Sequence, residues 1–385
     1  MLALATCCLM TLAMGTLHSW SVLSADLENT LNLSRTQSSL VYSLTLVSLT
    51  STVLFAVPLF SRLRPWVLFT SAATLAGLGL LCASSGSKIL LFVGYSGLFG
   101  FANGIGYGFA LQLSARAFSH RSGFAMGITT AAYALGATLG AQVLGSLVEA
   151  YTSLTTLRLH GLSFLILAPL LGLFIRASKV TYTIESKQST PMTIDSSVVN
   201  HYRACYGLAV FAGLMAIAHA TPYIISSGHT SESHNAISSA ASIALWGTIV
   251  LGLGNALGGV VAGIGADRYG AKLIITVLPA IAGVALCFAA FAPGAEVALT
   301  ALIAIGFTYG ALIAVYPVAI ARQFGESASA TAYGRIFIAW GVAGLLAPVI
   351  AGALYDVSHS YRYSLLLAML LSLASSVIAY RLQDH

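Results

Sequence analysis

Long apolar runs separated by short polar stretches recur from one end of the chain to the other. Each run is close to the twenty or so residues that a helix needs to cross a bilayer, so the pattern predicts membrane-spanning helices. The one long polar stretch divides the chain into two halves. Twelve spans are predicted, at 2–24, 38–60, 66–84, 89–112, 122–148 and 159–176 in the first half, and at 205–226, 236–263, 273–291, 296–320, 330–354 and 361–380 in the second.

One stretch organises the second half. The apolar run that holds Gly254, Gly258, Gly259 and Gly263 ends abruptly in the charged sequence DRYGAK, and another apolar run follows at once. Small residues at a spacing of four let one helix approach its neighbour closely. We therefore expect two membrane helices joined by a tight, charged turn that faces water.

The composition supports a membrane protein, because only 7% of the residues are charged and 58% are hydrophobic, against about 25% charged in soluble domains. The net charge of +6 comes from basic residues in short loops, where they act as topology signals and not as a nucleic-acid surface. The five cysteines lack the spacing of metal ligands. No phosphate-binding loop, zinc-protease motif or Ser-His-Asp set is found, so the sequence predicts neither an enzyme nor a cofactor or metal site.

The basic residues predict that both termini face the cytoplasm, because loops on that side are enriched in lysine and arginine. Of the 17 lysines and arginines, only Arg35, Lys88, Arg158 and Arg362 fall in the outer loops of this topology. Residues 1–23 lack the basic start of a signal peptide, so we expect them to form the first span.

An internal repeat relates the two halves. LFGFANG at 98–104 reappears as AIGFTYG at 304–310, and at the same offset of 206 Arg116 matches Arg322. A constant offset of this kind predicts two six-helix halves related by an axis along the membrane normal. The domains expected are an N-terminal bundle at 1–176, a cytoplasmic linker at 177–204 and a C-terminal bundle at 205–385.

The charged turn has the form GxxxDRxGxK at 263–272. This pattern resembles the loop signature of the major facilitator superfamily of secondary transporters. The resemblance implies an all-α membrane protein of twelve transmembrane helices in two pseudo-symmetric six-helix bundles. It also implies transport by rocking one half against the other around a central site.

The same resemblance implies a gating role for Asp267 and Arg268, flanked by Gly263 and Gly270. Members of the superfamily use this acid–arginine pair to hold the two cytoplasmic half-gates together in the outward-open state, as a switchable ion pair near a helix terminus. The first-half copy of the loop, at 60–64, has lost its acid. We therefore expect the C-terminal copy to carry the gate.

Three further segments are similar to the oxalate/formate antiporter and monocarboxylate porter group: GTLHSWSV at 15–22, RAFSHRSGFAMG at 116–127 and YGRIFIAWG at 333–341. That group typically has an arginine in its eighth helix that holds the substrate carboxylate, but Gly259 stands at this position here. A buried anion without a cationic partner is costly. Arg335, at the start of the eleventh span, is the candidate replacement.

Two histidines are the main candidates for chemistry inside the membrane, because no Asp or Glu lies near the middle of a predicted span. An ionisable residue within a span is by default a functional hypothesis. His18 and His219 occupy the equivalent first spans of the two halves, which in the superfamily line the central cavity. Either histidine could carry a proton or bind an anion; the alternative is a structural hydrogen bond to a neighbouring helix.

The other candidate substrate contacts are aromatic or polar residues within or near the ends of the spans. Their hydroxyl, indole and amide groups could orient a small polar substrate, whereas helix packing and interhelical hydrogen bonding are the alternatives. These residues are Trp20, Tyr107, Tyr133, Asn255, Tyr309 and Trp340.

We expect a monomeric secondary transporter in a bacterial-type inner membrane that moves a small organic anion, a mono- or dicarboxylate, by proton symport or anion exchange. Its partners would be the substrate, protons and the lipid bilayer, with no nucleic acid. Gly259 and the lack of buried carboxylates leave open a transporter or exporter of a neutral or weakly polar metabolite. A non-transporting membrane sensor on the same fold is a third alternative.

Overall fold

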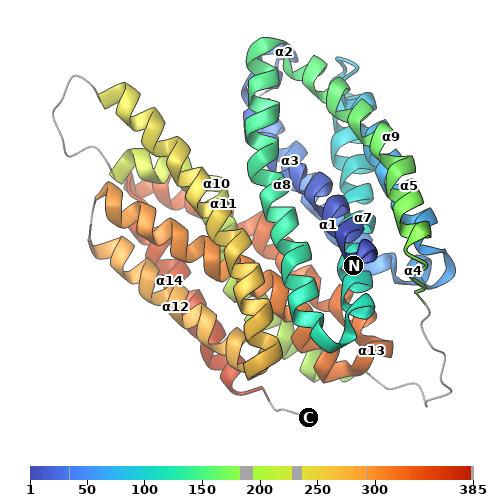
Figure 1. Ribbon diagram of the computed structural model, residues 1–385. Helices are drawn as coiled ribbons and strands as arrows, with labels where there is room; N and C mark the ends of the chain where they lie inside the picture. The colour runs from blue at the N-terminus through green and yellow to red at the C-terminus, as the bar shows by residue number, and fades with distance from the viewer. Residues whose placement is uncertain (34, 183–193, 228–235, 293, 383–385) are drawn as a thin grey trace. The chain divides into compact units, whose positions relative to one another are not determined.

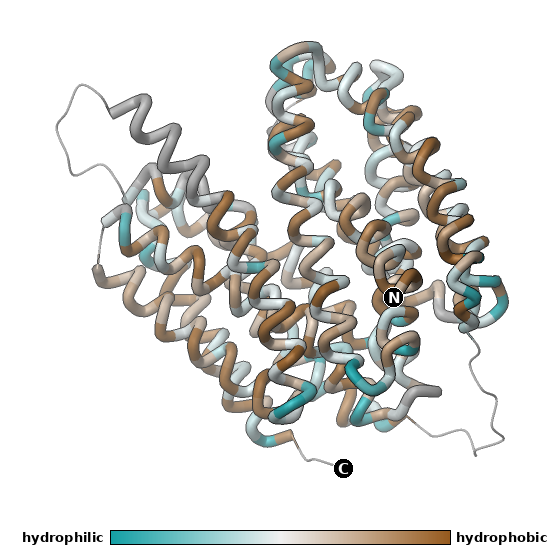
Figure 2. Tube along the Cα trace, viewed as in Figure 1, coloured by the Kyte–Doolittle hydropathy of each residue, from teal (hydrophilic) through white to brown (hydrophobic). Residues whose placement is uncertain are grey.

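A computed structural model of the chain describes residues 1–33, 35–182, 194–227, 236–292 and 294–382 (Figure 1). Every regular element within these ranges is a helix. Hydrophobic residues follow the lengths of the helices, and hydrophilic residues gather at helix ends and in turns (Figure 2). The helical fold predicted from the apolar runs is thus confirmed.

The first half contains the expected spans, several of them broken into shorter pieces. The first span is interrupted by a 3-10 turn, and the fourth contains a π-helical segment, η2. Its elements are α1 (Leu2–Gly15), η1 (Thr16–Ser19), α2 (Trp20–Thr30), α3 (Arg35–Phe55), α4 (Val57–Arg62), α5 (Pro65–Ala83), α6 (Lys88–Leu91), η2 (Phe92–Phe99), α7 (Gly100–Ala117), η3 (Ser119–Arg121), α8 (Ser122–Ala150) and α9 (Ser153–Ala177).

The second half has five longer helices. α13 bends at Gly325, whose φ of +73° lies in the left-handed region that favours glycine, so it supplies both the tenth and the eleventh predicted spans. The elements are α10 (Ser196–Ser227), α11 (Ala236–Tyr269), α12 (Ala271–Phe291), α13 (Ala295–Ser358) and α14 (Arg362–Tyr380).

Ten segments among the described residues are long and apolar enough to cross a membrane. The second predicted span corresponds to a shorter apolar helix, Leu40–Phe55, and the seventh lies within α10. Part of the predicted linker, at 183–193, lies outside the described residues. α10 begins before the end of that linker because Asp195 caps it: the carboxylate accepts a hydrogen bond of 2.7 Å from the Ser197 amide.

The chain divides into two compact units. Within unit 1, α5 and α9 lie side by side, and within unit 2 so do α12 and α14 (Figure 1). Unit 1 comprises Met1–Ala125, Ala132–Met192 and Tyr333–Ile338; unit 2 comprises Met126–Ala131, Thr193–Ala332 and Ala339–His385.

A glycine-mediated crossing joins α7 to α3 in unit 1. A Cβ atom added to Gly100 would lie 2.8 Å from the carbonyl oxygen of Thr45, and one added to Gly104 would lie 2.6 Å from that of Leu49. Real Cβ atoms do not approach backbone oxygens this closely. The two helices therefore depend on glycine for their separation.

Unit 2 repeats this crossing between α13 and α11. Gly306 faces the carbonyl oxygen of Leu251, and Gly310 faces that of Asn255. All four positions correspond to those of unit 1 at the offset of 206 found in the sequence. The internal repeat is therefore present in the packing as well as in the residues.

Candidate functional site

The first span breaks at the point where its sequence is most polar. Thr16–Ser19 forms a 3-10 turn, η1, between two α-helices, and such a turn within a helix often marks a functional position. Side chains from neighbouring helices fix it: the Tyr95 hydroxyl donates to the Leu17 carbonyl at 3.2 Å, and Thr16 Oγ1 lies 3.1 Å from His160 Nε2. His18 projects from this fixed turn.

Tyr95 lies in the π-helical segment η2. This second irregular backbone element is joined to η1 by the hydrogen bond from Tyr95 to Leu17. The indole ring of Trp20 packs on the Tyr95 ring with centroids 4.7 Å apart, and Trp20 is buried. Trp20 thus packs beside the break in the helix; its predicted contact with substrate stays a prediction.

The His18 side chain is half-buried and is held from two sides. Its Nδ1 atom lies 2.6 Å from the Tyr42 hydroxyl, and its ring meets the edge of the Tyr133 ring at a centroid distance of 5.5 Å. Tyr133 in turn packs on Tyr107 at 4.7 Å. The structure therefore brings together three of the predicted residues, His18, Tyr107 and Tyr133.

Asn103 is fully buried and is hydrogen-bonded to this group. Its amide Nδ2 donates to the Met14 carbonyl at 2.6 Å, and its Oδ1 accepts from the Tyr133 hydroxyl at 3.0 Å. We call His18, Tyr42, Asn103, Tyr107 and Tyr133 the His18 cluster. It combines one titratable group with neutral donors and acceptors whose orientations are set by hydrogen bonds.

His219, the counterpart in unit 2, has a different environment. Its Nε2 lies 3.0 Å from the Pro348 carbonyl and its Nδ1 3.3 Å from the Tyr361 hydroxyl. A carbonyl only accepts, so Nε2 carries the proton and Nδ1 accepts from Tyr361. Both ring nitrogens are thereby used to join α10 to α13 and α14. The adjoining cavity of about 20 Å³ has room for little more than a water molecule.

Four other predicted residues lie on α11 and α13: Tyr309, Trp340 and Asn255 in unit 2, and Arg335 in the part of α13 that belongs to unit 1. Trp340 Nε1 donates to the Tyr309 hydroxyl at 2.9 Å, and both side chains are buried. Asn255 is half-buried on α11, with its backbone and side-chain oxygens against Gly310. Arg335 has an exposed side chain on α13, and its predicted substrate contact stays a prediction.

The predicted gate residues lie at the turn between α11 and α12. Asp267 Oδ1 lies 3.6 Å from Arg322 Nη2, with the two side chains 22% and 46% exposed, whereas the Arg268 guanidinium lies over the Tyr269 ring at 5.3 Å. Gly270 has a φ of +92°, which allows the tight turn. The fourth gate residue, Gly263, is buried in α11.

Arg322, Tyr42 and Tyr361 are site residues that sequence reasoning did not select. The match of Arg322 with Arg116 in the repeat could have drawn attention to it as a partner for Asp267. Nothing in the sequence pairs the tyrosines with their histidines, because each pair joins distant segments. Among the described residues, no three His, Cys, Asp or Glu side chains lie close enough together to hold a metal ion.

Membrane-length helices packed twice in the same way, with hydrogen-bonded polar groups at a break in a span, are typical of integral membrane transporters. The sequence pattern of the Major Facilitator Superfamily matches residues 2–250 and 204–385. The chain belongs to this superfamily, whose members are transporters and not enzymes.

Individual proteins agree with this assignment. The chain is 24% identical over 348 residues to the "Uncharacterized MFS-type transporter YhjX" of Escherichia coli (strain K12), covering 86% of this chain and 83% of that one. A variant of the E. coli fucose:proton symporter FucP has a similar structure, with a TM-score of 0.70, 18% identity, and coverage of 99% and 98%. The proton:xylose symporter XylE has a TM-score of 0.71, 16% identity, and coverage of 98% and 95%. At these identities the two structures establish the fold alone.

Proposed function

We propose that the protein is a proton-coupled carrier of a small organic acid, with His18 as the group that takes up the proton. The observation that supports this most strongly is the contact between His18 Nδ1 and the Tyr42 hydroxyl at 2.6 Å beside a break in the first span. Protonated, His18 is a cation that offers a carboxylate the charge partner that Gly259 does not provide. Deprotonated, it releases the anion.

The rest of the His18 cluster would orient the substrate. Tyr42 and Tyr133 are half-buried, so part of each ring is available for contact, whereas Asn103 and Tyr107 are buried and support them. In unit 2 we expect Tyr309, Trp340 and Asn255 to contribute mainly to helix packing and to a smaller extent to substrate contacts. This pattern is compatible with the group suggested by the motifs, the oxalate/formate and monocarboxylate carriers.

A second candidate is a neutral, polar metabolite. The observation in its favour is that the cluster partners of His18 are all uncharged. FucP is described as a fucose:proton symporter and XylE as a proton:xylose symporter, so neutral substrates occur on this fold. On this alternative His18 would couple a proton without binding the substrate's charge.

We further propose the architecture that this function requires. A bundle at 1–176 and a bundle at 205–385 move about a linker at 177–204, with both termini in the cytoplasm, in a monomer of the bacterial inner membrane. Asp267, Arg268, Gly263 and Gly270 act at the cytoplasmic gate.

Counterflow in proteoliposomes tests the proposal. Vesicles are loaded with oxalate, formate, lactate or pyruvate, and with the matched neutral amides, between pH 5.5 and 8. We expect exchange of a carboxylate but not of its amide, faster at low pH, and loss of exchange in His18→Gln. His120→Gln, at an exposed position, is the matched control. Exchange of amides with equal rates, or full activity of His18→Gln, would refute the anion carrier.

A further inference from the structure

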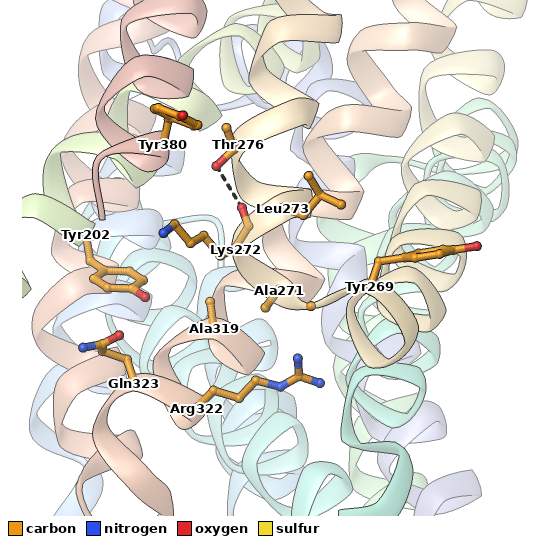
Figure 3. A pocket seen from close by; sticks show the side chains of 11 residues that line it. Tyr202, Tyr269, Ala271, Lys272, Leu273, Thr276, Ala319, Arg322, Gln323 and Tyr380 are labelled. Atoms are coloured by element: carbon orange, nitrogen blue, oxygen red, sulfur yellow. Dashed lines mark hydrogen bonds between the residues drawn. The ribbon is translucent and has the colours of Figure 1, made fainter. Parts of the chain in front are cut away.

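A pocket of about 500 Å³ opens where α11 turns into α12, within unit 2 (Figure 3). Its volume falls in the range typical of ligand sites. Tyr202 of α10 and Tyr380 of α14 line it, and Gln323 of α13 adds an amide group. The proposed substrate site does not use this space, whereas Gly270 of the gate and Arg322, the partner of Asp267, are among its lining residues.

The lining of the pocket favours an anion. It contains two cations, Lys272 and Arg322, and no carboxylate among the described lining residues. Figure 3 shows the Lys272 side chain reaching toward Tyr202. Arg322 also pairs with Asp267 at 3.6 Å, so part of its charge is offset.

A second, apolar groove continues from the pocket. It has a volume of about 470 Å³, shares Thr276 with the pocket, and follows α12 past Ala280 and Val284. At 1.5 Å per residue, this stretch of helix is about 12 Å long. Ser376 of α14 forms the junction, where its hydroxyl donates to the Thr276 carbonyl at 2.7 Å.

We propose that the pocket and groove together bind one anionic phospholipid, with its phosphate beside Lys272 and an acyl chain along α12. Free inorganic phosphate shares the headgroup chemistry, but it has no apolar part that would occupy the groove. Anionic lipids are enriched in the cytoplasmic leaflet, which is where the positive-inside distribution of basic residues places this turn. The site is independent of the identity of the transported substrate.

The corresponding position in unit 1 carries different residues. At the offset of 206, Trp66 replaces Lys272, and Arg116 corresponds to Arg322. The Arg116 guanidinium lies 4.3 Å from the centroid of the Tyr182 ring, and that tyrosine is buried. A side chain of the protein thus covers the cation of unit 1, whereas the cations of unit 2 line a pocket.

Native mass spectrometry of the delipidated full-length protein, titrated with phosphatidylglycerol or phosphatidylcholine, tests the charge requirement. We expect one phosphatidylglycerol to bind in preference to phosphatidylcholine. Lys272→Gln should weaken it about fivefold, the effect of about 1 kcal/mol per basic residue near a lipid surface. Lys272→Arg should retain binding, and Lys179→Gln is the matched control outside the pocket. Equal binding by wild type and Lys272→Gln would overturn the proposal.

A second arm separates lipid from phosphate. Ala280→Phe fills the groove and should weaken phosphatidylglycerol binding, while Ala353→Phe adds the same bulk at an exposed site on α13 and should not. Inorganic phosphate at millimolar concentration should leave the lipid bound. Displacement of the lipid by phosphate, together with normal lipid binding by Ala280→Phe, would show an inorganic phosphate site and refute the lipid site. Size-exclusion profiles of all variants confirm folding.

Discussion

The hydrogen bond between Tyr133 and Asn103 gives the sharpest test of the His18 cluster. Asn103 has no exposed surface and makes contacts of 2.6 Å to Met14 and 3.0 Å to Tyr133. Leucine has the same branched shape and the same number of side-chain heavy atoms as asparagine, so Asn103→Leu removes both hydrogen bonds without leaving a cavity. Interhelical hydrogen bonds in membranes contribute about 0.6 kcal/mol on average and up to about 1.7. The substitution should therefore cost about 1–2 kcal/mol.

A double-mutant cycle isolates the Asn103–Tyr133 bond. Tyr133→Phe should lower the free energy of unfolding by about 0.6–1.5 kcal/mol. The loss in the double variant should be smaller than the sum of the two single losses by about 0.5–1.5 kcal/mol. Unfolding in dodecyl maltoside by added dodecyl sulfate measures the free energies. The control cycle combines Asn103→Leu with Tyr182→Phe. The Tyr182 ring packs on Phe109 and not on Asn103, so these two losses should add. A coupling within about 0.3 kcal/mol of zero for Asn103 and Tyr133 would refute the interaction.

Three more predictions test the packing, the gate and the linker. Gly310→Ala should destabilise by about 1–3 kcal/mol through overpacking against α11, whereas Gly145→Ala meets nothing closer than 3.9 Å and should shift the melting temperature little. Asp267→Asn should change stability by less than about 1 kcal/mol, because the ion pair is partly exposed, but should speed cysteine labelling from the cytoplasmic side; unchanged labelling and transport would argue against a gate. Burial raises the pKa of Tyr182 outside the membrane, and the Arg116 guanidinium opposes the rise. Stability should be constant below about pH 10, the ordinary tyrosine pKa, and fall above it; Tyr182→Phe should lessen that fall, and an identical pH profile would contradict the assignment.

The sequence was sufficient to predict the helical fold, because membrane spans can be recognised from length and hydropathy alone. Its repeat offset also pairs the glycines that lie at the two crossings, Gly100 with Gly306 and Gly104 with Gly310, but not the residues of α3 and α11 that they face. Hydropathy could not predict the start of α10 at Ser196, because an aspartate cap and not an apolar residue sets it. Nor could it predict the 3-10 turn at Thr16–Ser19, which depends on partners from distant helices.

The candidate site was predictable as a set of residue types but not as an arrangement. His18 is a candidate because it is ionisable and lies within a span, and Tyr107 and Tyr133 because their hydroxyl groups could orient a substrate; the three do lie together. The partner of each histidine comes from elsewhere in the chain, Tyr42 for His18 and Tyr361 for His219. Such pairing depends on tertiary packing, which a single sequence does not encode in any local pattern.

The environments of the two histidines bear on why a symmetric fold would use its halves differently. His219 joins a carbonyl and a hydroxyl through both ring nitrogens, so a proton added at Nδ1 would reverse the bond with Tyr361, whose hydroxyl would then accept, and both nitrogens would stay committed to helix contacts. His18 Nδ1 faces the Tyr42 hydroxyl, which can accept as readily as donate, so protonation at Nδ1 keeps that bond. The charged turn shows the opposite asymmetry, since its acid remains only in the C-terminal copy. The proposed function places proton chemistry in one half and the ionic gate in the other, and on that proposal alternating access would link the two through motion of the whole protein.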